Sequence, residues 1–284
     1  MSITSSSMLV ELNISVWTAN KLDRGATDSV TNNANAVKNA AQVRKNLMAG
    51  TSQRKEIADH AAACRLWHNT KTLPWADKGA RLLPTSLFLD YKQEANNRRY
   101  AFDRMVNQFI ADYPALVQTS HNYLGNLFDP ADYPSPDEVY SKFGFRMVFA
   151  PVPESGDFRL DLPAQELEEV RRGYEDSFKD RLADAMKDPW DRLHKMLLGI
   201  SDKLTDKDGD EIKKRYHDSL IDNAVELCGV LTHLNVTGDP ALERARQDLE
   251  RTISNTDMES IKESATERAD VKNKVDAILK QYKW

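Results

Sequence analysis

Apolar residues recur at helical spacing over two long stretches, residues 163–204 and 212–234. Both series stay close to the period of an α-helix, so the pattern predicts two long helices joined by a polar turn and packed as an antiparallel hairpin. A helix of about 40 residues spans about 60 Å, a length typical of an arm, a coiled coil or a subunit contact. Pro189 lies within the first series without shifting its phase, which predicts a kink instead of an end.

Strict alternation of apolar and polar residues predicts a few β-strands near the start and middle of the chain. The three segments are residues 8–17, 143–150 and 158–162. The last two read as a hairpin, and the first has no other obvious partner. We therefore expect one small three-stranded sheet.

The rest of the chain is mostly helical in pattern. Helices are expected over Val30–Leu47, Ser52–His68 and Thr85–Asp112, with Pro114 interrupting the third. Asp239 and Pro240 form a helix start, and a single last helix opens near Thr256.

The fold expected from these patterns is mainly α, with the hairpin, further helices and the small sheet. Its domains would be a mixed helical domain with the sheet, the long hairpin, and the C-terminal helices, at residues 8–162, 163–237 and 238–284.

Composition fits a folded protein, since 40% of residues are hydrophobic and 29% charged. The net charge of −5 hides an asymmetry: residues 1–104 carry 15 basic and 9 acidic residues, whereas the remainder is strongly acidic. Two distant cysteines do not form a disulfide framework and favour a reducing cytosol. With no apolar run of about 20 residues, we expect no membrane contact.

One predicted helix carries a candidate metal cluster, because Glu56, His60, Cys64 and His68 follow one another at steps of four. Four residues overshoot the helical period, so the four side chains cannot all converge. The interpretation as ordinary residues at the edge of a core is favoured. With no catalytic signature and no Gly-rich phosphate loop, we expect no enzymatic activity, no catalytic residue, no metal and no cofactor.

Two sets of residues are candidates for partner binding. Trp75 lies between Pro74 and Pro84 in a loop that is more rigid than a polar turn, so it either plugs its own chain or anchors a partner. The second set is the apolar stripe of the hairpin, part of which we expect to face another subunit: Leu220, Leu227 and Leu231.

The basic N-terminal part supports an alternative function. Cations interleaved with tryptophans can hold single-stranded nucleic acid, and Arg98, Arg99 and Arg104 are the candidates. The other interpretation is that these cations balance nearby carboxylates.

Three segments carry a resemblance: Met8–Ala19, Thr72–Pro84, and Ser141–Phe145 leading to Pro151-Val152-Pro153. Together they resemble an uncharacterised family of tailed-bacteriophage proteins, a domain of unknown function. Its members are often encoded near a MoxR-type AAA+ ATPase and a von Willebrand A domain protein. The resemblance covers roughly residues 8–205 and carries no catalytic assignment.

The resemblance implies a phage protein made in the host bacterial cytoplasm. The expected function is a non-enzymatic assembly or adaptor protein that acts by self-association or by binding protein partners, among which are the ATPase and the von Willebrand A domain protein. The alternative is a nucleic-acid-binding accessory protein that uses the basic N-terminal half.

Overall fold

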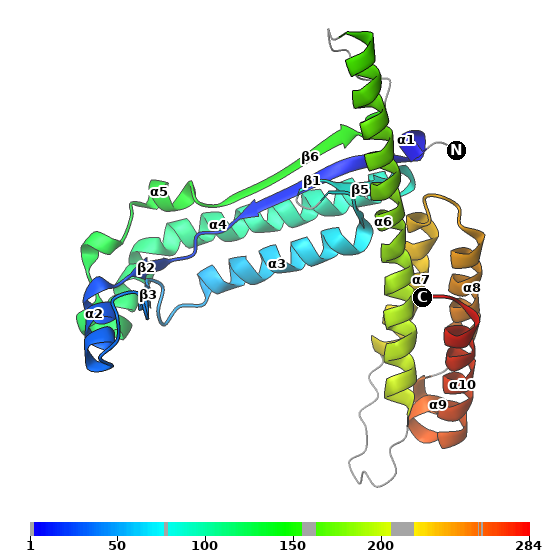
Figure 1. Cartoon of the computed structure of the whole chain (residues 1–284). Helices are drawn as coiled ribbons and strands as arrows, with labels where there is room; N and C mark the ends of the chain where they lie inside the picture. Colours follow the sequence, from blue (N-terminus) through cyan, green and yellow to red (C-terminus); the bar gives the residue numbers. More distant parts are fainter. Residues whose placement is uncertain (1–2, 77–78, 155–162, 206–218, 255, 257) are drawn as a thin grey trace. The chain divides into compact units, whose positions relative to one another are not determined.

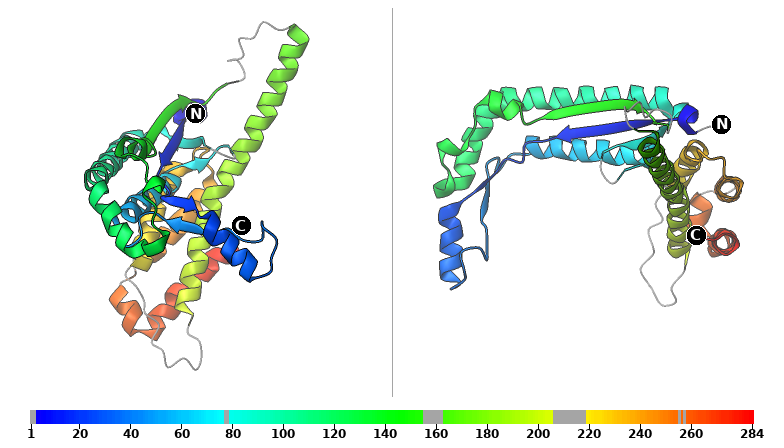
Figure 2. Two further views of the ribbon diagram at one scale, coloured as in Figure 1. Left: turned by 90° about the vertical axis from the view of Figure 1, so that its left-hand side faces the viewer. Right: turned by 45° about the horizontal axis from the view of Figure 1, so that its top comes forward.

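Helices dominate the computed structural model of this chain (Figures 1 and 2). The structure describes residues 3–76, 79–154, 163–205, 219–254, 256 and 258–284. It is about 70% helical, with one four-stranded and one two-stranded antiparallel sheet among these residues. The expectation of a mainly α fold is confirmed. None of the described helices combines the length and apolar character needed to cross a bilayer.

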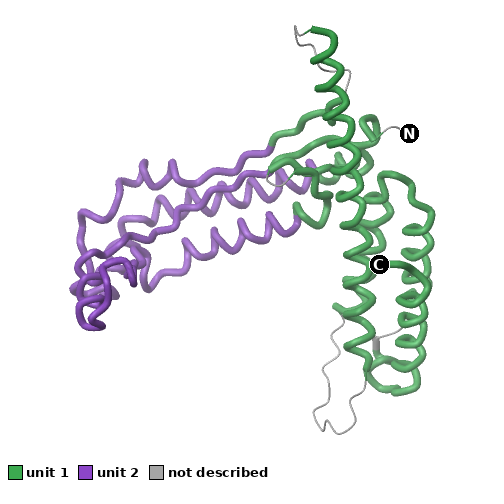
Figure 3. Tube along the Cα trace, viewed as in Figure 1, with its two compact units in different colours: residues 1–11, 68–91, 148–284 green, residues 12–67, 92–147 purple. Residues whose placement is uncertain are grey.

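The chain forms two compact units, each assembled from segments that are separated in sequence (Figure 3). Unit 1 contains residues 1–11, 68–91 and 148–284, and unit 2 contains residues 12–67 and 92–147. This grouping differs from the expected division into residues 8–162, 163–237 and 238–284. The C-terminal helices share a core with the hairpin, and the expected N-terminal domain is divided between both units.

A helical bundle makes up most of unit 1. Its helices are α6 (Ala164–Leu204), α7 (Ser219–Leu234), α8 (Pro240–Ser254), α9 (Met258–Glu263) and α10 (Ala265–Gln281). The core contains aliphatic side chains from all five, including Leu197, Leu231 and Leu249, each at most 1% exposed. The apolar stripe expected to face another subunit is therefore largely covered by α8 and α10 of the same chain.

A four-stranded sheet lies beside this bundle in the order β4-β5-β1-β6. The strands are β1 (Ser7–Ser15), β4 (Leu73–Pro74), β5 (Arg81–Pro84) and β6 (Gly144–Pro151). The expectation of three strands is wrong, because β4 and β5 fold from the segment that we interpreted as a loop. Both are too short for alternation to reveal them. The expected strand at residues 158–162 lies outside the described residues.

The strand pairing and its register explain why β4 and β5 form. Leu82 pairs with Leu73 on one side and with Leu9 on the other. Leu73 and Leu82 are fully buried and, with Trp75, form a second apolar cluster with Ala185 of α6. Unit 1 therefore fixes its sheet against α6 by side-chain packing.

Unit 2 contains most of two long helices and several short elements. They are α3 (Gln53–Lys71), α4 (Phe88–Leu124), α2 (Arg24–Asn33), α5 (Pro136–Tyr140), and the paired strands β2 (Asn20–Leu22) and β3 (Arg44–Asn46). Its core is aromatic, with Phe109 and Tyr113 of α4 packed around Trp17. The short helix α1 (Ile3–Ser6) and 3₁₀ turns at Thr85–Leu87, Gly125–Leu127 and Pro130–Asp132 complete the described elements.

A salt-bridge cluster ties β2 and β3 to the turn at Pro130–Asp132. Asp132 Oδ1 lies 2.7 Å from Lys21 Nζ, and its other oxygen contacts Lys45, whose ammonium also donates to the carbonyl of Leu127 at 3.0 Å. Burial would raise the pKa of Asp132, but the two lysines outweigh it and lower that pKa. The two-stranded sheet β2–β3 is thus held by charge pairing as well as by its backbone hydrogen bonds.

Several helix limits differ from expectation. Helix α4 continues through Pro114, because the buried Tyr113 and Leu116 fix the chain on both sides of the lost hydrogen bond. The helix expected over Val30–Leu47 is wrong, because α2 covers Arg24–Asn33 and Arg44–Asn46 form β3, paired with β2. The single last helix is wrong, since α10 starts separately with Ser264 as its N-cap, whereas the expected start of α8 at Pro240 is confirmed.

Candidate docking groove between helices α6 and α7

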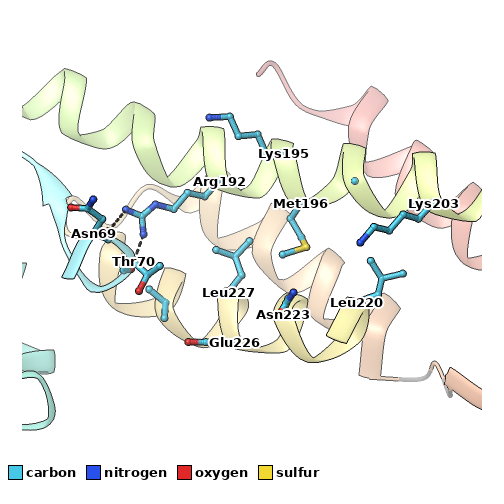
Figure 4. A pocket seen from close by; sticks show the side chains of 12 residues that line it. Asn69, Thr70, Arg192, Lys195, Met196, Lys203, Leu220, Asn223, Glu226 and Leu227 are labelled. Carbon is cyan, nitrogen blue, oxygen red and sulfur yellow. Dashed lines mark hydrogen bonds between the residues drawn. The ribbon is translucent and has the colours of Figure 1, made fainter. Parts of the chain in front are cut away.

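An open groove of about 610 Å³ runs between α6 and α7 in unit 1 (Figure 4). Helix α7 returns along α6, so Lys203 lies opposite Leu220 and Arg192 lies toward the end that carries Val230. Twelve side chains or glycines line it: Asn69, Thr70, Arg192, Lys195, Met196, Gly199, Lys203, Leu220, Asn223, Glu226, Leu227 and Val230. Apart from the adjacent pairs Lys195-Met196 and Glu226-Leu227, the lining positions on each helix are three or four residues apart and form one continuous face.

The floor of the groove is apolar. Met196 points down from α6 and Leu227 rises from α7, with Leu220 at one end (Figure 4). Met196 and Leu227 are half-buried and pack against the bundle core. The floor is thus a continuation of that core which helices α8 and α10 do not cover.

Gly199 helps to make the groove hollow. A Cβ atom built at this position would meet no heavy atom within 4 Å. Glycine in a helix interior costs about 0.5–1 kcal/mol relative to alanine. A side chain at this position would extend into the groove from α6.

The end of the groove nearest Arg192 is built by a hydrogen-bonded clamp. The Arg192 guanidinium donates to the carbonyls of Asn69, Thr70 and Thr72 at 2.7, 2.7 and 2.9 Å, and pairs with Asp188 at 2.7 Å. These carbonyls belong to the end of α3 and the residues after it, where helical carbonyls lack partners. The clamp holds this turn rigidly at the groove.

Charge on the groove is positive. Glu226 is the acidic residue of the lining, and it pairs with Lys71 at 3.4 Å. Lys195 and Lys203 are exposed, and no described residue pairs with either ammonium. Lys203 extends toward α7, whereas the Lys195 side chain is drawn on the side of α6 away from α7 (Figure 4). The arrangement combines an apolar floor with one cation that faces α7 and a second on the outer side of α6.

A buried polar pair lies beside the clamp in unit 1. His68 Nδ1 and Tyr91 Oη are 2.7 Å apart. Burial, helped by the nearby Arg81 guanidinium, lowers the pKa of His68 to about 4, and burial raises the pKa of Tyr91. Both side chains are neutral near pH 7 and serve packing and hydrogen bonding.

The four residues considered as a metal cluster occupy different hydrogen-bonded environments. His60 Nε2 lies 3.5 Å from Cys64 Sγ and 2.9 Å from the carbonyl of Arg98, while His68 bonds Tyr91 instead. Among the described residues, no three His, Cys, Asp or Glu side chains gather in a geometry suited to a metal ion. Burial raises the pKa of Cys64, which disfavours a reactive thiolate.

The residues proposed for partner binding occupy different environments. Trp75 is 5% exposed and meets Phe178 edge-to-face at 5.2 Å, so it plugs its own chain, the first of the two alternatives. Leu231 is 1% exposed and belongs to the core, leaving no surface for a partner. Leu220 borders the groove but is 5% exposed and belongs to the core, whereas the half-buried Leu227 remains a candidate.

The arginines proposed for nucleic acid lie on α4 in unit 2 and are largely neutralised. Arg98 pairs with Glu94 at 2.8 Å and lies over the Trp67 ring at 4.9 Å. Arg99 lies 3.7 Å from Asp103, and Arg104 is exposed. This pairing matches the interpretation in which the cations balance nearby carboxylates.

Sequence reasoning missed Arg192, Lys195, Gly199 and Lys203. Their spacing on one side of α6 is visible in the sequence, but a charged helix face is ordinarily solvated. Only the position of α7 shows that this face borders an apolar groove.

Comparison with protein-family models, with curated proteins and with solved structures finds no match to this chain.

Proposed function

We propose that this chain is a non-enzymatic protein that acts through protein–protein contacts, and that the groove between α6 and α7 receives a helical segment rich in acidic residues. The observation that carries the proposal is the apolar floor beside two lysines that no described residue neutralises. Amphipathic helices dock into such grooves through apolar side chains at helical spacing. Carboxylates on the incoming helix would meet Lys195 and Lys203.

The resemblance to the tailed-bacteriophage family supports a place in phage assembly, as an adaptor in the host bacterial cytoplasm. Self-association, a MoxR-type AAA+ ATPase and a von Willebrand A domain protein are the partners within this proposal. The buried thiols of Cys64 and Cys228, whose pKa values burial raises, fit a role without covalent chemistry. The nucleic-acid alternative gains no support from the paired arginines of α4.

A peptide titration tests the groove directly. The probe is a fluorescein-labelled amphipathic peptide with leucines at helical spacing and glutamates elsewhere, followed by fluorescence anisotropy. We expect it to bind, and a matched peptide with lysines in place of the glutamates to bind at least about tenfold more weakly. Equal affinity for the two peptides would contradict the proposal.

Two glycine variants provide the matched control. Gly199→Leu fills the groove, whereas Gly229→Leu adds the same side chain to exposed open space on α7 outside the groove lining. Binding of the acidic peptide should be lost in the first variant and retained in the second. If both variants bind as the wild type does, the groove is not the docking surface.

A further inference from the structure

The chain itself carries a segment suited to this groove. Residues 164–177, the first turns of α6, contain five acidic and two basic residues. The acidic side chains are all exposed: Glu166, Glu168, Glu169, Glu175 and Asp176. These turns extend beyond the other helices of the bundle in Figure 1 and in the left view of Figure 2.

An apolar edge runs along the same turns. Leu167, Val170 and Tyr174 are spaced three and four residues apart, so they lie on one side of the helix. Val170 is 37% exposed, although it is a β-branched apolar residue on an otherwise charged helix. Tyr174 donates a hydrogen bond to the carbonyl of Pro153, which fixes one end of this edge.

We propose that residues 164–177 of one copy of the chain dock in the α6–α7 groove of a second copy. This inference rests on the proposed function and names the partner of the same groove. The segment is acidic and amphipathic, and the groove offers an apolar floor with Lys195 and Lys203. The carboxylates of the segment can pair with the lysines of the groove, and the apolar edge of the segment can pack on the apolar floor.

The contact cannot form within one molecule. The segment and the groove face belong to the same continuous helix, with centres about 27 residues or about 40 Å apart. A helix cannot fold back on itself without breaking its hydrogen bonds. The groove is therefore filled in trans.

Lengths also agree. The groove face of α6 runs from Arg192 to Lys203, about 17 Å along the helix axis, and about three turns of the segment cover the same distance. A contact of about three helical turns buries less surface than the total of about 1,200 Å² that is the usual lower limit for stable complexes. We expect weak, concentration-dependent association.

The two surfaces differ, so the contact is heterologous. Each docked copy still presents a free groove at one end and a free segment at the other, and assembly continues into a ring or an open chain. A symmetric dimer would saturate at two copies instead.

Sedimentation velocity on the full chain over a concentration series tests this assembly. The wild type should show an average mass that rises with concentration beyond a dimer. Gly199→Leu should block the groove, and Val170→Glu should place a charge on the apolar edge, so each variant alone should stay a monomer. Gly229→Leu and Val225→Glu, which alter exposed positions outside both surfaces, should assemble like the wild type.

A mixture of the two blocked variants, Gly199→Leu and Val170→Glu, tests the heterologous contact directly. Gly199→Leu retains an intact segment and Val170→Glu retains an intact groove, so the mixture should form dimers and nothing larger. A mixture that stays monomeric while the wild type assembles would overturn the proposed contact. So would blocked variants that assemble normally.

A second binding measurement distinguishes this inference from the proposed function. A labelled peptide of residues 164–177 should bind wild-type protein and lose at least about tenfold in affinity to Gly199→Leu. If that peptide fails to bind while the designed acidic peptide binds, self-docking is wrong and the proposed function stands. If neither peptide binds, both are wrong.

Discussion

Arg192 of α6 donates a hydrogen bond to the main-chain carbonyl of Thr72 at 2.9 Å, across 120 residues of sequence. The same guanidinium also reaches two carbonyls at the end of α3. One side chain therefore completes a helix C-terminus and borders the groove.

Replacing Arg192 with alanine should destabilise the protein by about 2–4 kcal/mol. Three carbonyls lose a charged donor, and hydrogen bonds to charged groups contribute about 1.5–3 kcal/mol each in favourable cases. Arg192→Lys should rescue little, because an ammonium lacks the planar fork. Urea denaturation measures the effect, with Lys195→Ala as the control. Equal stability of Arg192→Ala and wild type would show that water replaces the clamp.

His68 should make stability depend on pH. Its pKa falls from 6.5 to about 4 on folding, so between these values the unfolded chain binds a proton that the folded chain does not. The free energy of unfolding should therefore drop by about 3 kcal/mol as pH falls from 6.5 to 4, and this contribution is fully present above pH 6.5. Because carboxylates also titrate, the measurement compares wild type with His68→Gln. Parallel pH profiles of the two proteins would contradict the assignment.

Trp75→Ala should lower stability by about 3–5 kcal/mol, the usual cost of truncating a buried aromatic residue. The ring lies against Phe178 and is 5% exposed, so its removal leaves a cavity between the sheet and α6. Thermal denaturation measures the loss. Unchanged stability together with lost assembly would instead identify Trp75 as an anchor for a partner.

Leu231→Ala should destabilise the bundle by about 2–5 kcal/mol, whereas Val225→Ala should have little effect. Both residues are on α7, but Leu231 is 1% exposed and Val225 is 54% exposed. Urea denaturation measures the free energy of unfolding of both variants. If Leu231→Ala kept its stability and lost only self-association, the bundle core would be an interface after all.

Replacing Arg98, Arg99 and Arg104 together with alanine should leave nucleic-acid binding unchanged, because we expect none in the wild type. Two of these cations are already paired with carboxylates. A gel-shift experiment measures this binding. It is run at about 50 mM salt, because low salt strengthens electrostatic binding and makes a weak complex easier to detect. A retarded band that the triple variant removes would restore the nucleic-acid alternative.

Local patterns predicted the long elements well. The apolar residues of α6 keep the same helical phase on both sides of Pro189, and the helix continues through that residue. Asp239 followed by Pro240 is typical of a helix N-terminus, and α8 begins there. Each of these signals lies within a few turns of one element.

The sequence alone does not reveal elements that depend on contacts with residues far away in the chain. Strand β5 pairs with β1 and β4 pairs with β5, and Pro74 and Pro84 conceal both strands in the sequence. Likewise, nothing local shows that α8 and α10 cover the hairpin's apolar stripe while leaving Met196 and Leu227 in a groove. Gly199 resembles any helical glycine until α7 is placed opposite.

The interleaving of the two units has a consequence for synthesis on the ribosome. Unit 1 takes strands from the beginning of the chain, yet its apolar cluster around Trp75 needs Ala185 and Leu234. Leu9 and Leu73 therefore leave the exit tunnel long before their partners exist, at a translation rate of about 5–20 residues per second. The helices from α6 onward, by contrast, share a core made of nearby sequence. The part of the chain from Ala164 onward is thus able to fold promptly and then pack against the segments made first.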